Sequence, residues 1–235
     1  VLGEFSPDVV VGAGGYVSGP MLMTAHFMTY PTLVMDSNAL PGFTNRQLAR
    51  FVDKAALTFD EALPYFGNKG VVTGNPVRGE FFDVPTREPN SPVRILIFGG
   101  SQGARAINNA IIAALPFMKE SGVAFEITHQ TGDAENEVEA DIRPYISNMV
   151  DEFERADVII CRAGATTCAE VAAAGKASIM VPLPSAADDH QRKNAEAMQK
   201  HGAVRVILQA DLSGERLADE LKRLIDDPLA IANMG

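Results

Sequence analysis

The sequence Asp157-Val-Ile-Ile-Cys161, Arg162-Ala-Gly-Ala-Thr-Thr-Cys-Ala-Glu170, Val171-Ala-Ala-Ala-Gly175 is the most informative part of this chain. It predicts a buried strand, a glycine turn and the N-terminus of a helix. Such a turn presents backbone N–H groups and the positive end of a helix dipole, which suit a phosphate. Glu170 lies one turn inside the helix, where it can reach a pair of ribose hydroxyls. The stretch therefore predicts a nucleotide site, and the alternative is an ordinary strand-to-helix connection.

Apolar runs typical of strands alternate with helical patterns along the whole chain. They cover residues 8–11, 32–35, 55–59, 70–73, 93–98, 125–129, 158–161, 178–181 and 204–207. An amphipathic pattern from Ser213 to Asp226 predicts a last helix. This alternation is typical of an α/β protein whose parallel sheet is covered by helices on both faces.

A polar, proline-rich segment between Glu80 and Pro92 predicts a linker. We therefore expect two α/β domains, an incomplete N-terminal one at residues 1–88 and a C-terminal one at 89–235. Three strands run into glycines and then a helix, at residues 12–15, 99–103 and 164. Ligands of open α/β sheets bind at the carboxyl ends of strands, so the cleft between the domains is the expected site.

The bulk composition narrows the function classes. A net charge of −10 over 235 residues argues against general nucleic-acid binding, which needs a positive surface. No run approaches the roughly 20 apolar residues that span a bilayer, and no stretch of the chain resembles a charged-then-apolar secretion signal. We therefore expect a cytoplasmic protein. Cys161 and Cys168 lack metal-ligand spacing and are expected to be buried, reduced and apolar in role. Because Val1 is not an initiator methionine and a strand follows almost at once, we expect a fragment of a longer protein that also continues past Gly235.

Two glycine motifs resemble known phosphate-binding loops in part. The run from Gly12 to Gly19, with Asp36 ending the next strand, imitates a dinucleotide fingerprint, but Val17 stands where the third glycine belongs. NAD is therefore disfavoured, and an anion at the helix start of residues 16–20 stays open. The run Gly99-Gly-Ser-Gln-Gly-Ala104 lacks the Lys-Ser/Thr ending of a nucleoside-triphosphate loop, so ATPase activity is also disfavoured.

The run Asp188-Asp-His-Gln191, followed by Asn194, opens a helical stretch. Asp188 or Asp189 can cap that helix, and we prefer capping to a metal site because no further ligand stands at a recognisable spacing. Gln191 and Asn194 share a helix face and carry neutral donors and acceptors suited to sugar hydroxyls.

The remaining polar candidates have simpler explanations. His26, His129 and His201 are expected to be structural, since each stands in a separate segment. Arg46, Arg50 and Lys54 are spaced to form one basic stripe if their segment is helical, either a solvated face or a contact for anionic lipid.

Five motifs in order give the chain a specific resemblance. They are Gly-Gly-Tyr-Val-Ser-Gly-Pro from Gly14, Gly-Asn-Pro-Val-Arg78, the 99–105 turn, the 162–170 turn and Asp-His-Gln…Asn-Ala195. The chain from Asp8 to about Asp226 resembles the MurG family of bacterial N-acetylglucosaminyltransferases, which complete the lipid-linked peptidoglycan precursor in cell-wall growth, cell shape and division. The resemblance implies the glycosyltransferase B architecture of two Rossmann-like domains, with the sugar donor bound mainly by the second.

The resemblance also implies a set of site residues. Glu170 would hold the ribose, Ile146 would lie against the uracil, and Gln191 would read the N-acetylglucosamine hydroxyls. The full implied donor set is Asn38, Arg78, Ser101, Ile146, Ala165, Thr166, Thr167, Cys168, Ala169, Glu170, Gln191 and Asn194. The implied acceptor side is Gly14, Gly15, Tyr16, Ser18 and Gly19. No metal or cofactor is implied, and the partners are UDP-N-acetylglucosamine, a lipid-linked muramyl-pentapeptide acceptor and the cytoplasmic face of the cell membrane.

Two departures from the family pattern limit these expectations. Met35-Asp-Ser-Asn38 replaces a His-Glu-Gln-Asn motif, and the family's opening glycine-rich loop, whose histidine is its proposed base, has no counterpart after Val1. We expect the catalytic base upstream of Val1 and the chain alone to be inactive. The alternatives are a UDP-N-acetylglucosamine 2-epimerase, which shares architecture and donor, and a truncated nucleotide-sugar-binding module.

Overall fold

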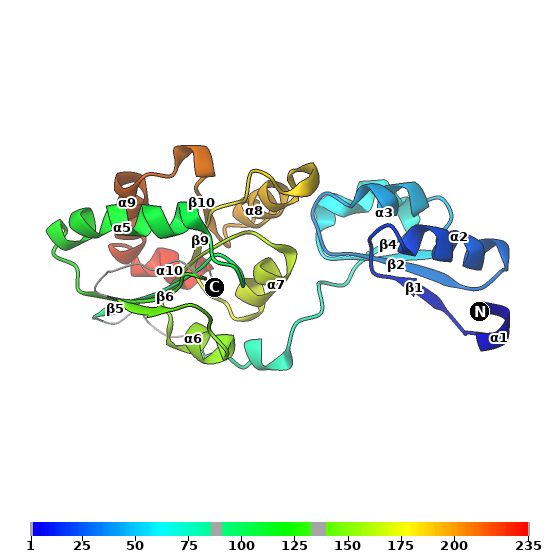
Figure 1. The fold of residues 1–235 in the computed structure, drawn as a ribbon, viewed down its shortest axis with the longest axis horizontal. Helices are drawn as coiled ribbons and strands as arrows, with labels where there is room; N and C mark the ends of the chain where they lie inside the picture. The colour runs from blue at the N-terminus through cyan, green and yellow to red at the C-terminus, as the bar shows by residue number, and fades with distance from the viewer. Residues whose placement is uncertain (1, 86–90, 133–139, 235) are drawn as a thin grey trace.

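A computed structural model describes residues 2–85, 91–132 and 140–234. The chain forms two lobes, each built on its own parallel sheet, and the ends of the described chain lie in different lobes (Figure 1). The predicted boundary between residues 88 and 89 falls among residues 86–90, outside the described ranges, so the division stays a prediction.

The first sheet has the strand order β1-β2-β3-β4, and every neighbouring pair is parallel. Its strands are β1 (Val10–Gly12), β2 (Thr32–Asp36), β3 (Lys54–Leu57) and β4 (Gly70–Val72). The helices of this lobe are α1 (Leu2–Phe5), α2 (Ser18–Phe27), α3 (Phe43–Leu48) and α4 (Leu63–Phe66). Leu22, Val34 and Leu57 are fully buried between sheet and helices, which gives this lobe a core of its own.

The second sheet has the order β10-β9-β8-β5-β6-β7, again with parallel neighbours. Its strands are β5 (Val93–Phe98), β6 (Phe125–Gln130), β7 (Asp141–Arg143), β8 (Val158–Cys161), β9 (Ser178–Met180) and β10 (Arg205–Val206). Its helices are α5 (Arg105–Glu120), α6 (Met149–Arg155), α7 (Ala165–Ala173), α8 (His190–Lys200), α9 (Gly214–Ile225) and α10 (Pro228–Met234). The prediction of parallel sheets and of all nine strand positions is confirmed.

Both faces of the second sheet are covered, which explains why its strands are apolar without alternation. Ile95 and Ile97 of β5 face a core shared with α5 and α9, whereas Leu96 and Phe98 face the opposite core with α6 and α7. Phe81, which precedes the predicted boundary, belongs to that opposite core. Its ring is fully buried and lies 5.0 Å from that of Phe153, centroid to centroid, in edge-to-face geometry.

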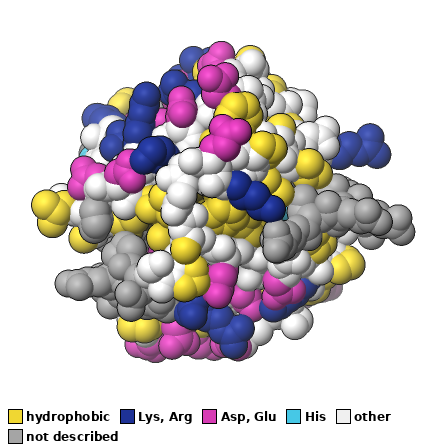
Figure 2. Space-filling view, turned by 90° about the vertical axis from the view of Figure 1, so that its left-hand side faces the viewer, with side chains coloured by type: hydrophobic (Ala, Val, Ile, Leu, Met, Phe, Trp, Pro, Cys, Tyr) yellow, Lys and Arg dark blue, Asp and Glu magenta, His cyan; other side chains and the backbone are white. Residues whose placement is uncertain are grey.

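The predictions of a last helix and of a basic stripe have different outcomes. The last helix is confirmed, since Ser213 Oγ accepts a hydrogen bond from the Arg216 N–H (3.1 Å) and caps α9. The predicted helical stripe of Arg46, Arg50 and Lys54 is wrong, because α3 ends at Leu48 and Lys54 already belongs to β3. Arg46 is drawn instead to Asp188 of the other lobe, with an N–O distance of 3.1 Å. On the end of the molecule shown in Figure 2, Lys and Arg side chains are interspersed with Asp and Glu.

Candidate active site

The predicted donor turns lie at one edge of the second sheet. β5 and β8 run parallel with Phe98 opposite Cys161, so the turns that follow them, at residues 99–103 and 162–165, are neighbours. β9 lies beside β8, with Cys161 opposite Met180, and adds the loop before α8 to the same edge. Ser101, Ala165 and the start of α8 are therefore brought to one side of the lobe, as a shared ligand site requires.

Glu170 and Arg78 come together at α7. Gly164 opens this helix without any side-chain cap, so Ala165, Thr166 and Thr167 present the free N–H groups of the first turn. Burial raises the pKa of the half-buried Glu170 carboxyl, and the charge of Arg78 opposes that rise. The Arg78 guanidinium lies 5.0 Å from the centroid of the Phe81 ring, which fixes the position of that charge.

The apolar side of α7 is closed to polar ligands. Cys168 is buried, and its Sγ lies 3.9 Å from Met180 Sδ. Burial raises the pKa of the Cys168 thiol to about 12. Cys168 and Ala169 also line an apolar cavity of about 320 Å³ with Val77. The prediction that both cysteines are buried is confirmed, and any ligand contact at Cys168 would involve its main chain.

Gln130 joins two donor segments that are far apart in sequence. Its buried side chain donates from Nε2 to Gly100 O (2.8 Å) and accepts at Oε1 from the Ile146 N–H (2.9 Å). The Ile146 side chain is itself buried in the core, so a base beside it would meet main chain. Ser101 stays exposed at the tip of the glycine turn. Gln130 was not predicted as a site residue. It directly follows the predicted strand at residues 125–129 and is the last residue of β6, at the ligand edge of the sheet.

The glycine turn is also held by backbone contact. A Cβ on Gly103 would lie 2.0 Å from Thr131 O, and one on Gly132 would lie 2.3 Å from Gln102 O. Both glycines have positive φ, 71° and 70°. The two loops can therefore pack this closely only because neither carries a side chain at these positions.

Arg162, the first residue after β8, is a buried connector. Its guanidinium donates to Val181 O (3.0 Å), Pro182 O (3.2 Å) and Gln209 Oε1 (2.8 Å). Burial lowers its pKa, but an arginine stays charged under all ordinary conditions. The residue therefore fixes the loops after β8 and β9 relative to one another.

A second cavity, of about 470 Å³, joins the two lobes. It is lined by Gly14, Gly15 and Tyr16 after β1, by the 35–38 segment after β2, and by Asp188 and His190 before and in α8. Three of the predicted acceptor-side residues are thus brought together with Asn38. Ser18 and Gly19 do not line this cavity. Ser18 instead donates from Oγ to Gly14 O (2.5 Å), and Gly19 is buried against Thr44.

Asp36 shapes the loop that presents Asn38. Its buried carboxylate accepts hydrogen bonds from the Asn38 N–H (3.0 Å), the Gly42 N–H (3.0 Å) and Asn45 Nδ2 (2.7 Å). The departure from the family motif at this position therefore leaves an acid with a defined structural task. Asn38 itself faces Asn194 of α8, whose Nδ2 donates to Asn38 Oδ1 (3.1 Å).

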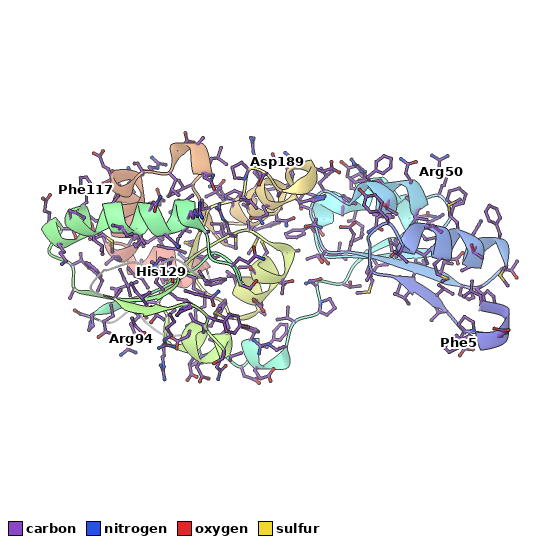
Figure 3. All side chains as sticks on the ribbon, viewed as in Figure 1. Phe5, Arg50, Arg94, Phe117, His129 and Asp189 are labelled. Carbon is purple, nitrogen blue, oxygen red and sulfur yellow. The ribbon has the colours of Figure 1, made fainter. Side chains whose placement is uncertain are left out.

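The turn before α8 differs from the predicted cap. Asp189 stands at the N-cap position but makes no capping hydrogen bond, because both Asp188 and Asp189 have positive φ, 48° and 56°. That conformation points Asp188 to Arg46 instead of to the helix N–H groups. Figure 3 labels Asp189 at the start of α8. Gln191 accepts at Oε1 from the Leu183 N–H (3.0 Å), which ties the helix to the loop after β9.

Within residues 2–85, 91–132 and 140–234, no three His, Cys, Asp or Glu side chains gather into a set that could hold a metal ion. Over the same ranges, no helix is both long and apolar enough to cross a bilayer.

Two parallel sheets whose ligand edges flank the cavity between the lobes form the glycosyltransferase B fold. The chain belongs to glycosyltransferase family 28: residues 94–235 match the model of its C-terminal domain and residues 1–57 that of its N-terminal domain.

Two relatives of this chain carry the name of one and the same enzyme. The chain is 41% identical over 269 residues to the UDP-N-acetylglucosamine–N-acetylmuramyl-(pentapeptide) pyrophosphoryl-undecaprenol N-acetylglucosamine transferase of Pelobacter propionicus, covering 100% of this chain and 71% of the relative. It is 44% identical to the enzyme of the same name from Geobacter sulfurreducens, covering 100% and 69%. Among solved structures it is similar to Acinetobacter baumannii MurG, with a TM-score of 0.79, 33% identity and coverage of 99% and 69%. The resemblance read from the motifs is thereby confirmed.

Proposed function

We propose that the protein transfers N-acetylglucosamine from UDP-N-acetylglucosamine to the lipid-linked muramyl-pentapeptide acceptor of peptidoglycan synthesis. The observation that carries the proposal is the convergence of α7, the 99–103 turn and α8 on one sheet edge that faces the acceptor-side cavity of the other lobe. The relatives named above carry this same activity in their names.

The family resemblance implies an inverting reaction at this site. An acceptor hydroxyl attacks the anomeric carbon with inversion, a new glycosidic bond forms, and the bond from that carbon to the diphosphate oxygen breaks as UDP leaves. A general base takes the hydroxyl proton. The first-turn N–H groups of α7, from Ala165 to Thr167, stabilise the negative charge that grows on the departing diphosphate. The geometry supplies this stabilisation from main-chain dipoles.

The residue roles fit this chemistry. Glu170 accepts hydrogen bonds from the ribose hydroxyls, and Arg78 lies close enough to balance its charge. Ser101, exposed on the glycine turn, meets the donor, and the main chain at Ile146 meets the uracil. The acceptor pyrophosphate binds beside Gly14, Gly15 and Tyr16, and the donor sugar binds on the opposite side, at Gln191.

The assignment of Glu170 is tested by UDP binding without added divalent ion. We expect Glu170→Ala to weaken UDP binding by about 1–3 kcal/mol, the usual loss of a charge-assisted hydrogen bond. Titration calorimetry measures the affinity, and Glu154→Ala, an exposed glutamate of α6, is the matched control. Equal UDP affinity in wild type and Glu170→Ala would refute the role of Glu170.

The reaction class is tested by the conditions that release UDP. The chain spans 71% and 69% of the length of the two relatives named above, so the assay uses the protein at their full length. Transfer requires the lipid-linked acceptor, so UDP should appear only when both substrates are supplied. Conversion of the donor to its 2-epimer, UDP-N-acetylmannosamine, in the absence of acceptor would favour the epimerase alternative, and donor binding without turnover in the presence of acceptor would favour a binding module.

A further inference from the structure

Helix α8 and the turn before it carry the polar contacts between the two lobes. Asp188 pairs with Arg46 (3.1 Å) at one end, and Lys200 pairs with Glu61 (3.2 Å) at the other. Both pairs are solvent-exposed, and the Lys200 side chain is 70% exposed. Exposed ion pairs of this kind contribute little to the free energy of association. Among these polar contacts, the one that can favour the closed arrangement most is therefore at Asn194, between the two ends. Phe59 of the first lobe adds apolar packing against the core of the second.

Asn194 is completely buried, with 0% of its surface exposed. Its Oδ1 accepts from the Ala39 N–H (2.8 Å), and its Nδ2 donates to Asn38 Oδ1 (3.1 Å) and to Ala163 O (3.2 Å). Asn38 and Ala39 belong to the loop after β2, whereas Ala163 lies in the turn that opens α7. One side-chain amide thus bonds the acceptor loop of the first lobe and the donor turn of the second.

We propose that Asn194 is a positioning residue that closes the two lobes on one another and couples the donor turn to the acceptor loop. The assignment of these loops to donor and acceptor rests on the proposed function, whereas the closure itself does not. Closure follows from hydrogen-bond accounting: opening exchanges the two bonds of Asn194 to Ala39 and Asn38 for bonds to water, and each of them favours the closed arrangement by a modest net amount.

The same accounting separates this role from direct sugar recognition. An asparagine amide has two N–H donors, and both are taken by Asn38 and Ala163. No donor of Asn194 is left for a sugar hydroxyl while the lobes are closed. Gln191, one turn earlier, has its Oε1 held by Leu183 and carries its amide nitrogen toward no partner within the described residues, so that nitrogen is the better candidate for the sugar.

The test uses the ligand-free protein and two measurements. Hydrogen exchange of the Ala39 N–H reports opening of the contact, and the distance between nitroxide labels at Lys54→Cys and Glu120→Cys reports the separation of the lobes. Both label positions are exposed, whereas the native cysteines are buried. The variants are Asn38→Leu, Asn38→Asp and Asn194→Ala, with Lys200→Ala as the control that removes an exposed contact between the lobes.

Asn194→Ala should lower the ratio of closed to open protein about tenfold, because two hydrogen bonds between the lobes are lost. Asn38→Leu should do so to a smaller extent, and Asn38→Asp should restore the wild-type values, since its carboxylate still accepts from Asn194 Nδ2. Lys200→Ala should change neither measurement. Asn38→Leu leaves the bond to Ala163 intact, so it remains informative if Asn194→Ala fails to fold.

Unchanged Ala39 exchange and label distance in Asn38→Leu and Asn194→Ala would overturn the proposal, as would an equal effect of Lys200→Ala. UDP affinity, measured by calorimetry on the same proteins, keeps the two proposals apart. If the wild type does not bind UDP, the proposed function is contradicted. Closure of the lobes is still judged by hydrogen exchange and by the label distance.

Discussion

His129 shows how burial alone sets the chemistry of a side chain in this protein. Its Nε2 lies 3.0 Å from Asn108 Oδ1, and Asn108 in turn donates to Thr131 O (3.1 Å) next to the glycine turn. Burial lowers the pKa of His129 from its ordinary 6.5 to about 4. The neutral imidazole is thus the folded form, and the structural role of His129 stays a prediction that its burial supports.

The pH dependence of stability follows from that pKa. Because the unfolded chain binds a proton between pH 6.5 and 4 that the folded protein refuses, the contribution of His129 is complete above 6.5 and is lost as pH falls toward 4. We expect the wild type to lose about 2 kcal/mol from this group between pH 7 and pH 5. Urea unfolding at the two pH values measures it.

His129→Gln keeps a donor for Asn108 and should flatten this pH dependence. The matched control is His201→Gln, which replaces an exposed histidine and should leave the dependence as it is. An identical loss of stability in wild type and His129→Gln would show that the acid sensitivity arises elsewhere.

For single residues, the sequence indicated which ones belong to the site better than it indicated what each of them does. Glu170 was predicted from the strand-to-helix pattern at α7, whereas Arg78, which stands beyond β4, was assigned from the family resemblance, and their charges interact in the structure. The duties of Asp36, Gln130 and Asn194 could not be foreseen. Gln130 and Asn194 depend on partners brought near by tertiary packing, and the first-lobe partners of Asn194 lie 155 and 156 positions away in the chain. The partners of Asp36 are close in sequence but depend on the fold of an irregular loop.

Among the secondary-structure elements, the turn after β5 depends most strictly on glycine. Gly103 and Gly122 have nearly the same φ, 71° and 73°, but a Cβ would collide with Thr131 at the first and would meet nothing within 4 Å at the second. Both alanine variants lose about 1 kcal/mol for the strained backbone. Gly103→Ala must also push the two loops apart.

We therefore expect Gly103→Ala to lose at least about 2 kcal/mol more stability than Gly122→Ala, the scale of an overpacked site. It should also weaken UDP binding, which Gly122→Ala should not. Urea unfolding and calorimetry measure the two effects. Equal losses in the two variants would mean that the loops after β5 and β6 yield easily.

The elements themselves were largely predictable, since strands buried on both faces leave continuous apolar runs such as Val93–Phe98. β7 was missed because Asp141–Arg143 is a short edge strand without an apolar pattern. The extent of α3 was wrong because charge spacing cannot show that the chain must turn at residues 49–53 to enter β3. The cap at Asp189 failed through a backbone conformation that no composition rule announces.

For the molecule as a whole, the first lobe presents an apolar groove of about 690 Å³ between α2 and α3. Tyr16, Phe27 and Phe43 lie along it with 89%, 71% and 63% of their surfaces exposed, and Arg50 stands at its edge. Figure 3 places Arg50 on the lobe away from the second sheet. We propose that this face rests on the membrane that carries the lipid acceptor.

Phe27→Asp should lower binding to phosphatidylglycerol vesicles several-fold, because burial of a phenylalanine ring is lost and a charge repelled by the lipid is gained. Vesicle sedimentation measures the bound fraction. Phe117→Asp, at an exposed phenylalanine of α5 in the other lobe, is the control. A similar drop in both variants would assign the effect to charge rather than to the groove.

The burial of Phe81 has a practical consequence for dissecting the enzyme. This ring sits in the second lobe although it precedes residue 88, so a carboxyl-terminal half excised at that point would leave an empty slot against Phe153. An excision at Arg78 would retain the ring as a plug, together with the guanidinium stacked on it. The piece that keeps the second lobe's core intact therefore starts at Arg78, well before Val93, where its sheet begins.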